Sequence, residues 1–308
     1  MEYKIRRIAP SDINNLIKLF KNSFRWNPSI AEIEKKYNTA ILGPVNTGFI
    51  AFSDDETPAA YYGVFAVKLC IEGEIVQAAQ SGDTATHSNH RGKGLFIELA
   101  KKTYSLCNEL GIEIVFGFPN KNSYPGFVKK LNWVHMHDID VFSIPVRTVP
   151  IIKLVRKFPI LKETYLSVVR MFIKNKVYKP DSFSSVISKG LTGIYRDGAY
   201  LSYKESRDKF FLNNHSISWV KFDGSLIIGD VIAKDSIALK KHLKWLKRIA
   251  FFTGCNKITF CSSPDTVLHQ QFSEIATVVD TMPVGIMAVS ERMLPVKIFF
   301  TGADFDNF

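Results

Sequence analysis

The chain has 308 residues, of which 46% are hydrophobic and 22% charged, a composition typical of folded globular proteins with one large domain or two of ordinary size. Lys and Arg number 40 against 29 Asp and Glu, and the resulting charge of +11 favours anionic partners such as nucleotides, nucleic acid or an anionic membrane surface. No uncharged apolar run reaches the roughly 20 residues of a membrane span, and the four cysteines lack Cys-x-x-Cys spacing, so we expect a cytoplasmic protein without a metal site or disulfides.

The first 145 residues alternate between patterns typical of strands and of helices. In chain order, we expect strands at 2–8, 48–53, 59–71, 75–86, 112–118 and from 133 onward, and helices at 10–20, 28–37, 91–110 (with its entering loop) and 119–131. The order is β-α-α-β-β-β-α-β-α-β. The run 112–118 is almost fully apolar, which predicts a central buried strand.

The second half begins with a basic segment. Between residues 151 and 180 there are eight Lys or Arg and one acid, Glu163. The pattern predicts helices over 149–178, strands at 199–203, 216–222, 226–232 and 257–261, and a helix at 237–252. This repeats the strand–helix–strand order of the first half. We therefore divide the chain into a domain 1–145, a basic helical linker 146–180 and a second lobe 181–308.

The most informative motif is Arg91-Gly-Lys-Gly-Leu-Phe96, which lies between an expected strand and an expected helix. Backbone N–H groups at a helix start attract anions. Gly92 and Gly94 permit backbone conformations that a Cβ hinders, and Arg91 and Lys93 add charge suited to a pyrophosphate. The motif fits neither a Walker loop nor the Gly-x-Gly-x-x-Gly dinucleotide fingerprint.

This motif resembles the acyl-CoA pyrophosphate loop of the GNAT N-acyltransferases, Gln/Arg-x-x-Gly-x-Gly/Ala. Arg91 and Gly94 match, whereas Phe96 replaces a small residue. Residues 117–133 resemble the fifth strand and fourth helix of the same family, so the resemblance covers about residues 1–145. It implies an α/β (α+β) GNAT fold, with a central mixed, mostly antiparallel sheet flanked by helices. The second half then resembles a degenerate GNAT-like lobe, as in Eis-type tandem enzymes and certain sugar N-acyltransferases.

The resemblance also implies acyl-CoA, with an acetyl or longer acyl chain, as co-substrate, and no metal. The backbone of the fourth strand would bind the pantetheine and polarise the thioester carbonyl. The residues that the resemblance assigns to acyl-CoA are Thr84, Ala85, Thr86, Arg91, Gly92, Lys93, Gly94, Leu95, Phe96, Asn120 and Ser123.

The acid and the base of the reaction are less clear from the sequence. The family's usual tyrosine acid falls at Val128, and its carboxylate base falls near Gln80, neither of which transfers protons. The candidate catalytic residues are therefore Asp83, Tyr124 one helical turn before Val128, and His87. Each has a structural alternative: Asp83 capping a bulge, Tyr124 packing, and His87 on the surface. The Phe308 carboxylate is a further contender, by analogy with Eis-type enzymes.

These residues predict an acyl-CoA-dependent N-acyltransferase in which an amine attacks the thioester directly. For the acceptor, the resemblance favours a small amine on a nucleotide-linked amino sugar, such as a dTDP-amino-deoxysugar used for surface polysaccharide. The alternatives are a peptide or antibiotic acetyltransferase, a Fem-type aminoacyl-tRNA-dependent transferase and a non-catalytic acyl-CoA sensor. We expect no stable nucleic-acid partner and a monomer or homodimer.

Overall fold

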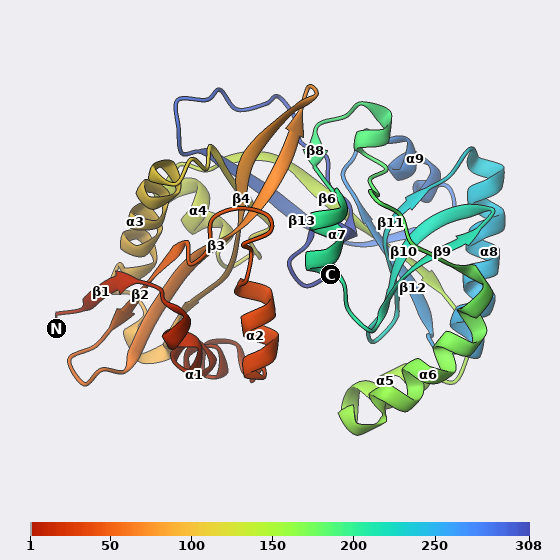
Figure 1. The fold of residues 1–308 in the computed structure, drawn as a ribbon, viewed down its shortest axis with the longest axis horizontal. Helices are drawn as coiled ribbons and strands as arrows, with labels where there is room; N and C mark the ends of the chain where they lie inside the picture. The colour runs from red at the N-terminus through yellow and green to blue at the C-terminus, as the bar shows by residue number, and fades with distance from the viewer. Residues whose placement is uncertain (1) are drawn as a thin grey trace. The chain divides into compact units, whose positions relative to one another are not determined.

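The computed structural model describes residues 2–308, without the side chain of residue 159, and divides into two compact units (Figure 1). The first comprises Met1–Met136 with Pro283–Val296, and the second His137–Met282 with Lys297–Phe308. Each unit combines distant parts of the chain, whereas the sequence-based division into 1–145, 146–180 and 181–308 follows chain order.

The first unit is a mixed, mostly antiparallel sheet with helices on both faces. Its strands are β1 (Lys4–Arg7), β2 (Gly48–Phe52), β3 (Pro58–Ile71), β4 (Glu74–Thr86) and β5 (Ile114–Gly117), and its helices are α1 (Ile13–Phe24), α2 (Ile30–Tyr37), α3 (Leu95–Glu109) and α4 (Tyr124–Leu131). Neighbouring strands pair in the order β1-β2-β3-β4-β5, and the β4–β5 pair is parallel. The apolar sides of α3 and α4 share one core cluster and those of α1 and α2 another. The expected order of elements and the expected fold class are confirmed.

One strand of this unit comes from the far end of the chain and was not expected. Strand β13 (Thr277–Ala288) pairs antiparallel with β5, with Gly285 opposite Gly117 and Ala288 opposite Ile114. Strand β5 therefore has a partner on each edge and is an interior strand, and all four of its residues are buried.

The second unit repeats this strand pattern. Its strands are β6 (Val134–Pro145), β7 (Val177–Tyr178), β8 (Gly193–Ile194), β9 (Lys209–Asn214), β10 (Ser216–Phe222), β11 (Leu226–Ile232) and β12 (Lys257–Ser262), and its helices are α5 (Ile151–Lys157), α6 (Lys162–Ile173), α7 (Gly198–Lys204), α8 (Ser236–Phe252) and α9 (Val267–Ser273). Strands pair in the order β6-β12-β11-β10-β9-β7, and the β11–β12 pair, which α8 connects, is parallel.

The expected strand at 199–203 is wrong, because these residues belong to helix α7. The Asp197 side chain accepts a hydrogen bond from the Tyr200 N–H at 3.0 Å and begins the helix, and Tyr200 and Leu201 are buried. A short apolar run does not distinguish a strand from a buried helix. Strand β9 was also missed.

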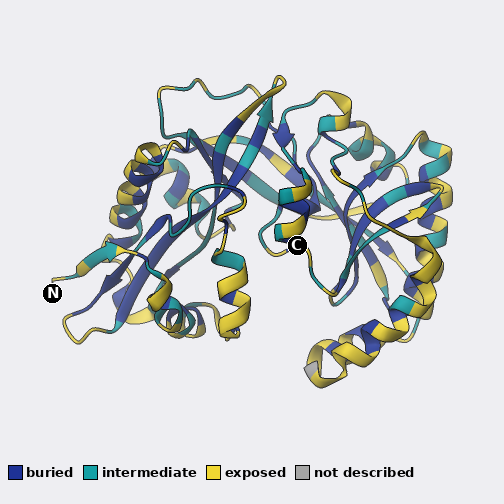
Figure 2. Ribbon diagram, in the orientation of Figure 1, coloured by how far each residue is buried: buried dark blue, intermediate teal, exposed yellow. Residues whose placement is uncertain are grey.

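The basic segment 149–178 is helical, as expected, but it packs as part of the second unit. Ile152 and Val155 of α5 and Leu166 and Val169 of α6 belong to the core cluster of that unit. Figure 2 shows buried and exposed residues alternating along both helices. Among residues 2–308, no helix has the length and apolar character needed to cross a membrane.

The C-terminal segment 297–308 fills the space where β11 and β12 separate. Parallel pairing between the two strands ends at Ile228 and Phe260. Beyond that point, Thr301 forms an antiparallel bridge with Ser262, and the Phe300 N–H donates to the Ser263 hydroxyl at 2.8 Å. The segment therefore adds a short strand to this edge of β12.

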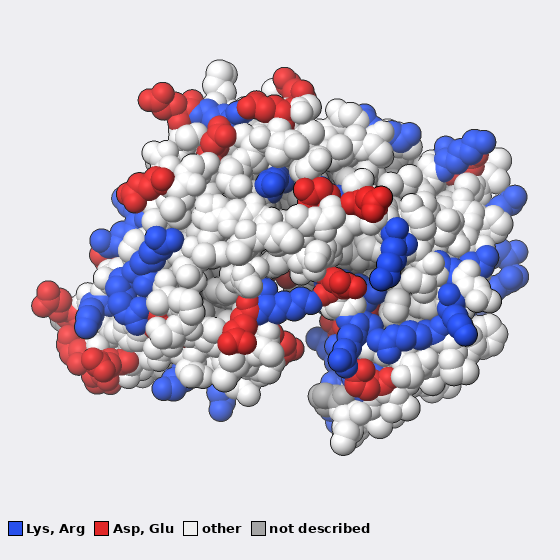
Figure 3. All heavy atoms as spheres, in the orientation of Figure 1, with Lys and Arg blue, Asp and Glu red and all other residues white. Residues whose placement is uncertain are grey.

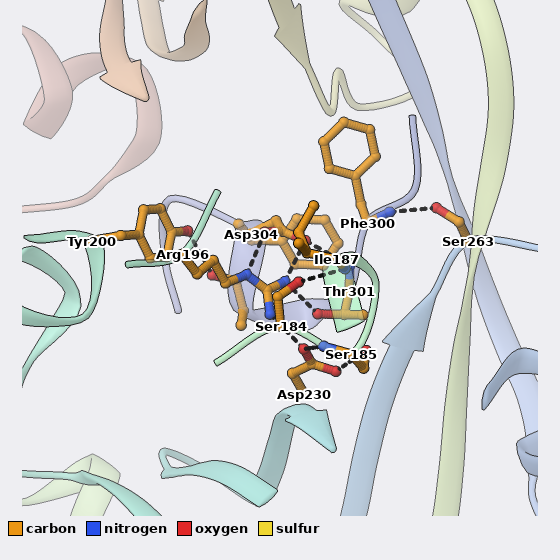
Figure 4. Close-up of polar contacts among 12 residues, drawn as sticks. Ser184, Ser185, Ile187, Arg196, Tyr200, Asp230, Ser263, Phe300, Thr301 and Asp304 are labelled. Carbon is orange, nitrogen blue, oxygen red and sulfur yellow. Dashed lines mark hydrogen bonds and ion pairs between the residues drawn. The ribbon is translucent and has the colours of Figure 1, made fainter. Parts of the chain in front are cut away.

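A buried ion cluster anchors this segment (Figure 4). The Arg196 guanidinium lies 2.6 Å from carboxylate oxygens of both Asp230 and Asp304, and it also donates to the Thr301 hydroxyl at 2.7 Å. Ser185 donates to Asp230 through its N–H and its hydroxyl. Burial raises the pKa of Asp304, which Arg196 opposes.

The ring of Phe308 is buried in the same unit. It packs edge-on against Trp219, with ring centroids 5.1 Å apart. A Cβ on Gly229 would lie 2.2 Å from the Phe308 ring, so this close approach requires glycine.

Candidate active site

The candidate active site is the opening between β4 and β5. The two strands pair only over Ala78–Gln80 and Ile114–Phe116, while β4 continues beside β3 as far as Thr86. A cleft of about 400 Å³ lies at this separation, within the first unit. Its lining consists of Phe24, Ser81, Gly82, Asp83, Thr84, Thr86, Phe96, Gly117, Phe118, Pro119, Asn120, Asn122, Ser123, Gly126, Phe127 and Trp133.

A bulge in β4 shapes one wall of this cleft. Asp83 and Thr84 lie opposite the single residue Tyr62 of β3, and Asp83 has a left-handed φ of 53°. Such a bulge bends the strand and redirects its side chains. Asp83 is therefore part of the bulge and also lines the cleft.

The unusual Phe96 is accommodated by a glycine on the next helix. Its ring packs edge-on against Phe127, 5.2 Å between centroids, and a Cβ on Gly126 would lie only 3.1 Å from it. The large residue at the start of α3 is thus matched by a small one on α4. Trp133 similarly covers Gly117 and leaves little room for a Cβ there.

A buried chain of hydrogen bonds connects the cleft to the core. The Trp133 indole N–H donates to the Tyr104 hydroxyl at 2.9 Å, the hydroxyls of Tyr104 and Tyr62 are 2.7 Å apart, and Ser81 donates to Tyr62 at 3.0 Å. Burial raises the pKa of both tyrosines, so they stay protonated at neutral pH. These hydrogen bonds fix the position of Ser81 at the point where β4 separates from β5. Sequence analysis did not predict this network, because no local pattern links its residues.

The loop 91–94 has the geometry of an anion site. Gly92 and Gly94 have φ of 75° and 80°, and a Cβ on either would meet nothing within 4 Å, so conformation and not space requires glycine there. Within residues 2–308, the backbone N–H groups of residues 91–96 have no hydrogen-bond acceptor; the first N–H groups of α3 that do, Ile97 and Glu98, bond to the Gly94 carbonyl. Residues 91–94 are exposed, so unpaired donors at the start of a helix are open to an anion there.

Asp83 is the one expected catalytic residue that lines the cleft. Its carboxylate lies 2.8 Å from the Lys36 ammonium and accepts a hydrogen bond from the Tyr37 hydroxyl at 3.3 Å. The Lys36 ammonium also lies over the rings of Trp26 and Phe65. Sequence reasoning missed Lys36, which α2 brings to the bulge.

Tyr124 and His87 are not among the described residues that line this cleft. The Tyr124 ring contacts His135 edge-on, with centroids 5.7 Å apart. His87 accepts a hydrogen bond from the Asn89 N–H at 3.3 Å, and burial together with His90 and Arg91 lowers the pKa of His87.

The other residues expected to bind acyl-CoA divide into two groups. Thr84, Thr86, Asn120 and Ser123 line the cleft, and the Asn120 amide oxygen accepts from the Ser123 N–H at 3.0 Å at the start of α4. Ala85 is buried in the core cluster that includes α1 and α2, and Leu95 in the cluster that includes α3 and α4. The Thr84 hydroxyl is buried and has no hydrogen-bond partner within the described residues.

Comparisons with known proteins agree with this geometry. Residues 4–136 match the family model described as an acetyltransferase (GNAT) domain. No curated protein matches the chain significantly. Among solved structures, similarity extends over both units: a GCN5-related N-acetyltransferase from Kribbella flavida is 13% identical with a TM-score of 0.59, covering 92% of this chain and 70% of its own.

Two further structures show the same extent. A probable N-acyltransferase of unknown function from Enterococcus faecalis is 12% identical with a TM-score of 0.61, over 94% of this chain and 73% of its own. The N-myristoyltransferase of Saccharomyces cerevisiae with bound myristoyl-CoA is 11% identical with a TM-score of 0.59, over 95% and 84%. At such identities these likenesses show the fold alone.

The loop and the separated strands both lie within residues 4–136, the part of the chain that matches the GNAT acetyltransferase domain. The activity that this match indicates is acyl transfer.

Proposed function

We propose that the protein transfers an acyl group from acyl-CoA to an amine by direct attack in the β4–β5 cleft. The observation that carries this proposal is the row of unpaired N–H groups at residues 91–96, which adjoins the strand that forms one wall of the cleft. Backbone donors of this kind bind a pyrophosphate, and two separated strand edges accept an extended amide-containing arm.

The residues present fit acyl-CoA along its length. Arg91 and Lys93 supply charge for the diphosphate. Thr84 and Thr86 of β4, together with Asn120 and Ser123 just before α4, line the cleft in which the pantetheine would lie. The Thr84 hydroxyl fits this assignment because the chain itself leaves it without a partner. Acyl-CoA supplies the activated thioester when bound.

Asp83 is the proposed contact for the acceptor amine. A carboxylate in the wall of the cleft attracts an ammonium group and accepts a proton from it. The Lys36 ammonium, 2.8 Å from this carboxylate, holds it in place at the wall of the cleft. Tyr124 remains the proposed acid for the leaving thiolate and His87 a second proposed base, and neither assignment rests on a contact with the cleft.

For the acceptor, we propose a nucleotide-linked amino sugar, with recognition by the second unit as a degenerate GNAT-like lobe. The charge of +11 supports an anionic acceptor, and it disfavours a polycationic drug. A peptide amine, an aminoacyl-tRNA-dependent reaction and a non-catalytic sensor are the alternatives that the experiment separates.

The experiment measures thiol release from acetyl-CoA through myristoyl-CoA with nucleotide-linked amino sugars, amine drugs and peptide N-termini as acceptors. We expect turnover confined to amino sugars, a rise in the KM for the amine and a fall in kcat in Asp83→Asn, and no change in the exposed control Asp54→Asn. Turnover with peptides would replace the proposed acceptor. Tight CoA binding without turnover on any amine, or transfer of the aminoacyl group from aminoacyl-tRNA with no release of CoA, would overturn the proposed reaction.

A further inference from the structure

The helical hairpin of α5 and α6 exposes apolar side chains on the side that faces away from the core. Ile160 at the corner between the helices is 89% exposed and Met171 on α6 is 77% exposed. Other large apolar residues are exposed on the same segment: Val149, Ile151, Leu154, Phe158, Leu161, Val168 and Phe172. Helices at the surface of a globular protein normally place polar residues there, so this concentration indicates a binding surface.

This apolar surface continues onto the end of α8. The rings of Phe172 and Phe252 stack at 5.6 Å with an angle of 10° between their planes. Ile151 packs against Gly254, where a Cβ would lie 2.6 Å from it. Phe251 and Phe252 are themselves about half exposed. We call the exposed apolar residues of 149–172 together with Phe251 and Phe252 the apolar patch.

Cations without acidic partners surround the apolar patch. Within residues 2–308, none of the following has a salt bridge: Arg147, Lys153, Lys157, Lys174, Lys176, Lys179, Lys247 and Arg248. The acid of the hairpin, Glu163, pairs with Arg207. Figure 3 shows Lys and Arg atoms beside the largely uncharged surface of α5 and α6.

Apolar residues surrounded by unpaired cations are complementary to an anionic bilayer. The apolar side chains enter the boundary between headgroups and acyl chains, and each Lys or Arg near the surface adds electrostatic attraction to acidic headgroups. A second copy of the same surface would bring like charges together. RNA would attract the cations, but it would leave Ile160 and Met171 in water.

We propose that α5, α6 and the end of α8 form a docking surface for anionic membranes. The protein lies on the bilayer through the apolar patch, and the surrounding cations contact acidic lipid headgroups. This surface is separate from the β4–β5 cleft and does not depend on the reaction catalysed there.

The experiment measures binding of the full chain to mixed phosphatidylcholine–phosphatidylglycerol vesicles and to pure phosphatidylcholine vesicles by flotation. We expect binding to the anionic vesicles that weakens at high salt, and little binding to the neutral ones. Ile160→Asp with Met171→Asp, and separately Lys153→Glu with Lys157→Glu, each reduce the affinity more than about tenfold. The controls Met293→Asp, at a residue 90% exposed in the first unit, and Lys101→Glu with Lys102→Glu on α3 leave it unchanged.

Circular dichroism of each variant establishes that it is folded. The proposal is overturned if the wild-type chain does not bind anionic vesicles. It is also overturned if the Ile160 and Met171 variant binds as tightly as wild type, since charge alone would then account for the affinity. Self-association that the Asp substitutions abolish, or RNA binding that they leave intact, without vesicle binding, would assign the surface to those partners instead.

Discussion

Each unit contains a parallel pair of strands joined through a helix. The pair in the first unit separates to leave a cleft, whereas the chain itself fills the separation in the second unit. In the first unit, β4 and β5 are joined through α3 and separate to leave a cleft of about 400 Å³. In the second, β11 and β12 are joined through α8, and residues 299–302 lie where these strands separate. The chain thus supplies in one unit the extended segment that a ligand would supply in the other.

This difference explains why the glycine loop occurs in the first unit alone. Between β4 and α3, the donors of residues 91–96 remain available. Between β11 and α8, the helix instead begins with the Asp235 side chain accepting from the Ala238 N–H at 2.7 Å. A capping carboxylate satisfies a helix start and disfavours an anionic ligand there. The same strand–helix–strand arrangement therefore forms a candidate binding cleft in the first unit and part of the structural core in the second.

The largest expected effect comes from opening the filled region. Arg196→Met leaves Asp230 and Asp304 buried without their cation, which should reduce the free energy of unfolding by about 3–5 kcal/mol. Urea unfolding followed by circular dichroism measures it. The control Arg207→Met removes an exposed pair with Glu163 and should cost at most about 1 kcal/mol. Similar small losses in both variants would show that the cluster does not anchor the C-terminal segment.

A second effect tests a buried group on α8. The Asn214 carbonyl accepts a hydrogen bond from His242 Nδ1 at 2.5 Å, so Nε2 accepts from the Ser218 hydroxyl at 2.9 Å and the ring is neutral. Burial lowers the pKa of His242 to about 4. Between pH 6.5 and 4 this histidine is protonated in the unfolded chain and neutral in the folded chain. The free energy of unfolding therefore falls as the pH falls from 6.5 towards 4, by about 3 kcal/mol in total.

Urea unfolding from neutral pH to about pH 4 measures this dependence. His242→Gln should remove most of the steep part of the curve. His215→Gln removes only the smaller effect of a neighbouring charge on His242 and should keep most of it. The assignment fails if the His242 variant keeps the same slope, because another group would then take up the proton.

The site divides into a part that sequence predicts and a part that it does not. The loop 91–94 was predictable because its glycines and cations are contiguous and their φ values require glycine. The roles of Lys36 and Trp133 were not predictable, because Lys36 contacts Asp83 and Trp133 contacts Tyr104, residues that are far from them along the chain. Strand β13 was missed for the same reason, since its partner β5 is distant in sequence.

Substitutions in the loop 91–94 should change the affinity for CoA and leave the free energy of unfolding unchanged. Arg91→Ala with Lys93→Ala removes two charges beside the free N–H groups and should weaken CoA binding by about 1–3 kcal/mol, several-fold to a hundredfold. Isothermal titration calorimetry measures the affinity. The matched control, Lys101→Ala with Lys102→Ala on the exposed side of α3, should bind CoA normally. Unchanged affinity in the folded loop variant would remove the pyrophosphate site.

The smallest expected effect compares two threonines with buried, unpartnered hydroxyls. Thr84 lines the β4–β5 cleft, whereas Thr47 does not. Thr84→Val should weaken CoA binding several-fold, by about 1 kcal/mol, with no loss of stability, because the hydroxyl has no bond within the chain to lose. Thr47→Val should leave the affinity unchanged. If both substitutions leave the affinity for CoA unchanged, the Thr84 hydroxyl does not bind the ligand, and neither threonine hydroxyl contributes to CoA binding.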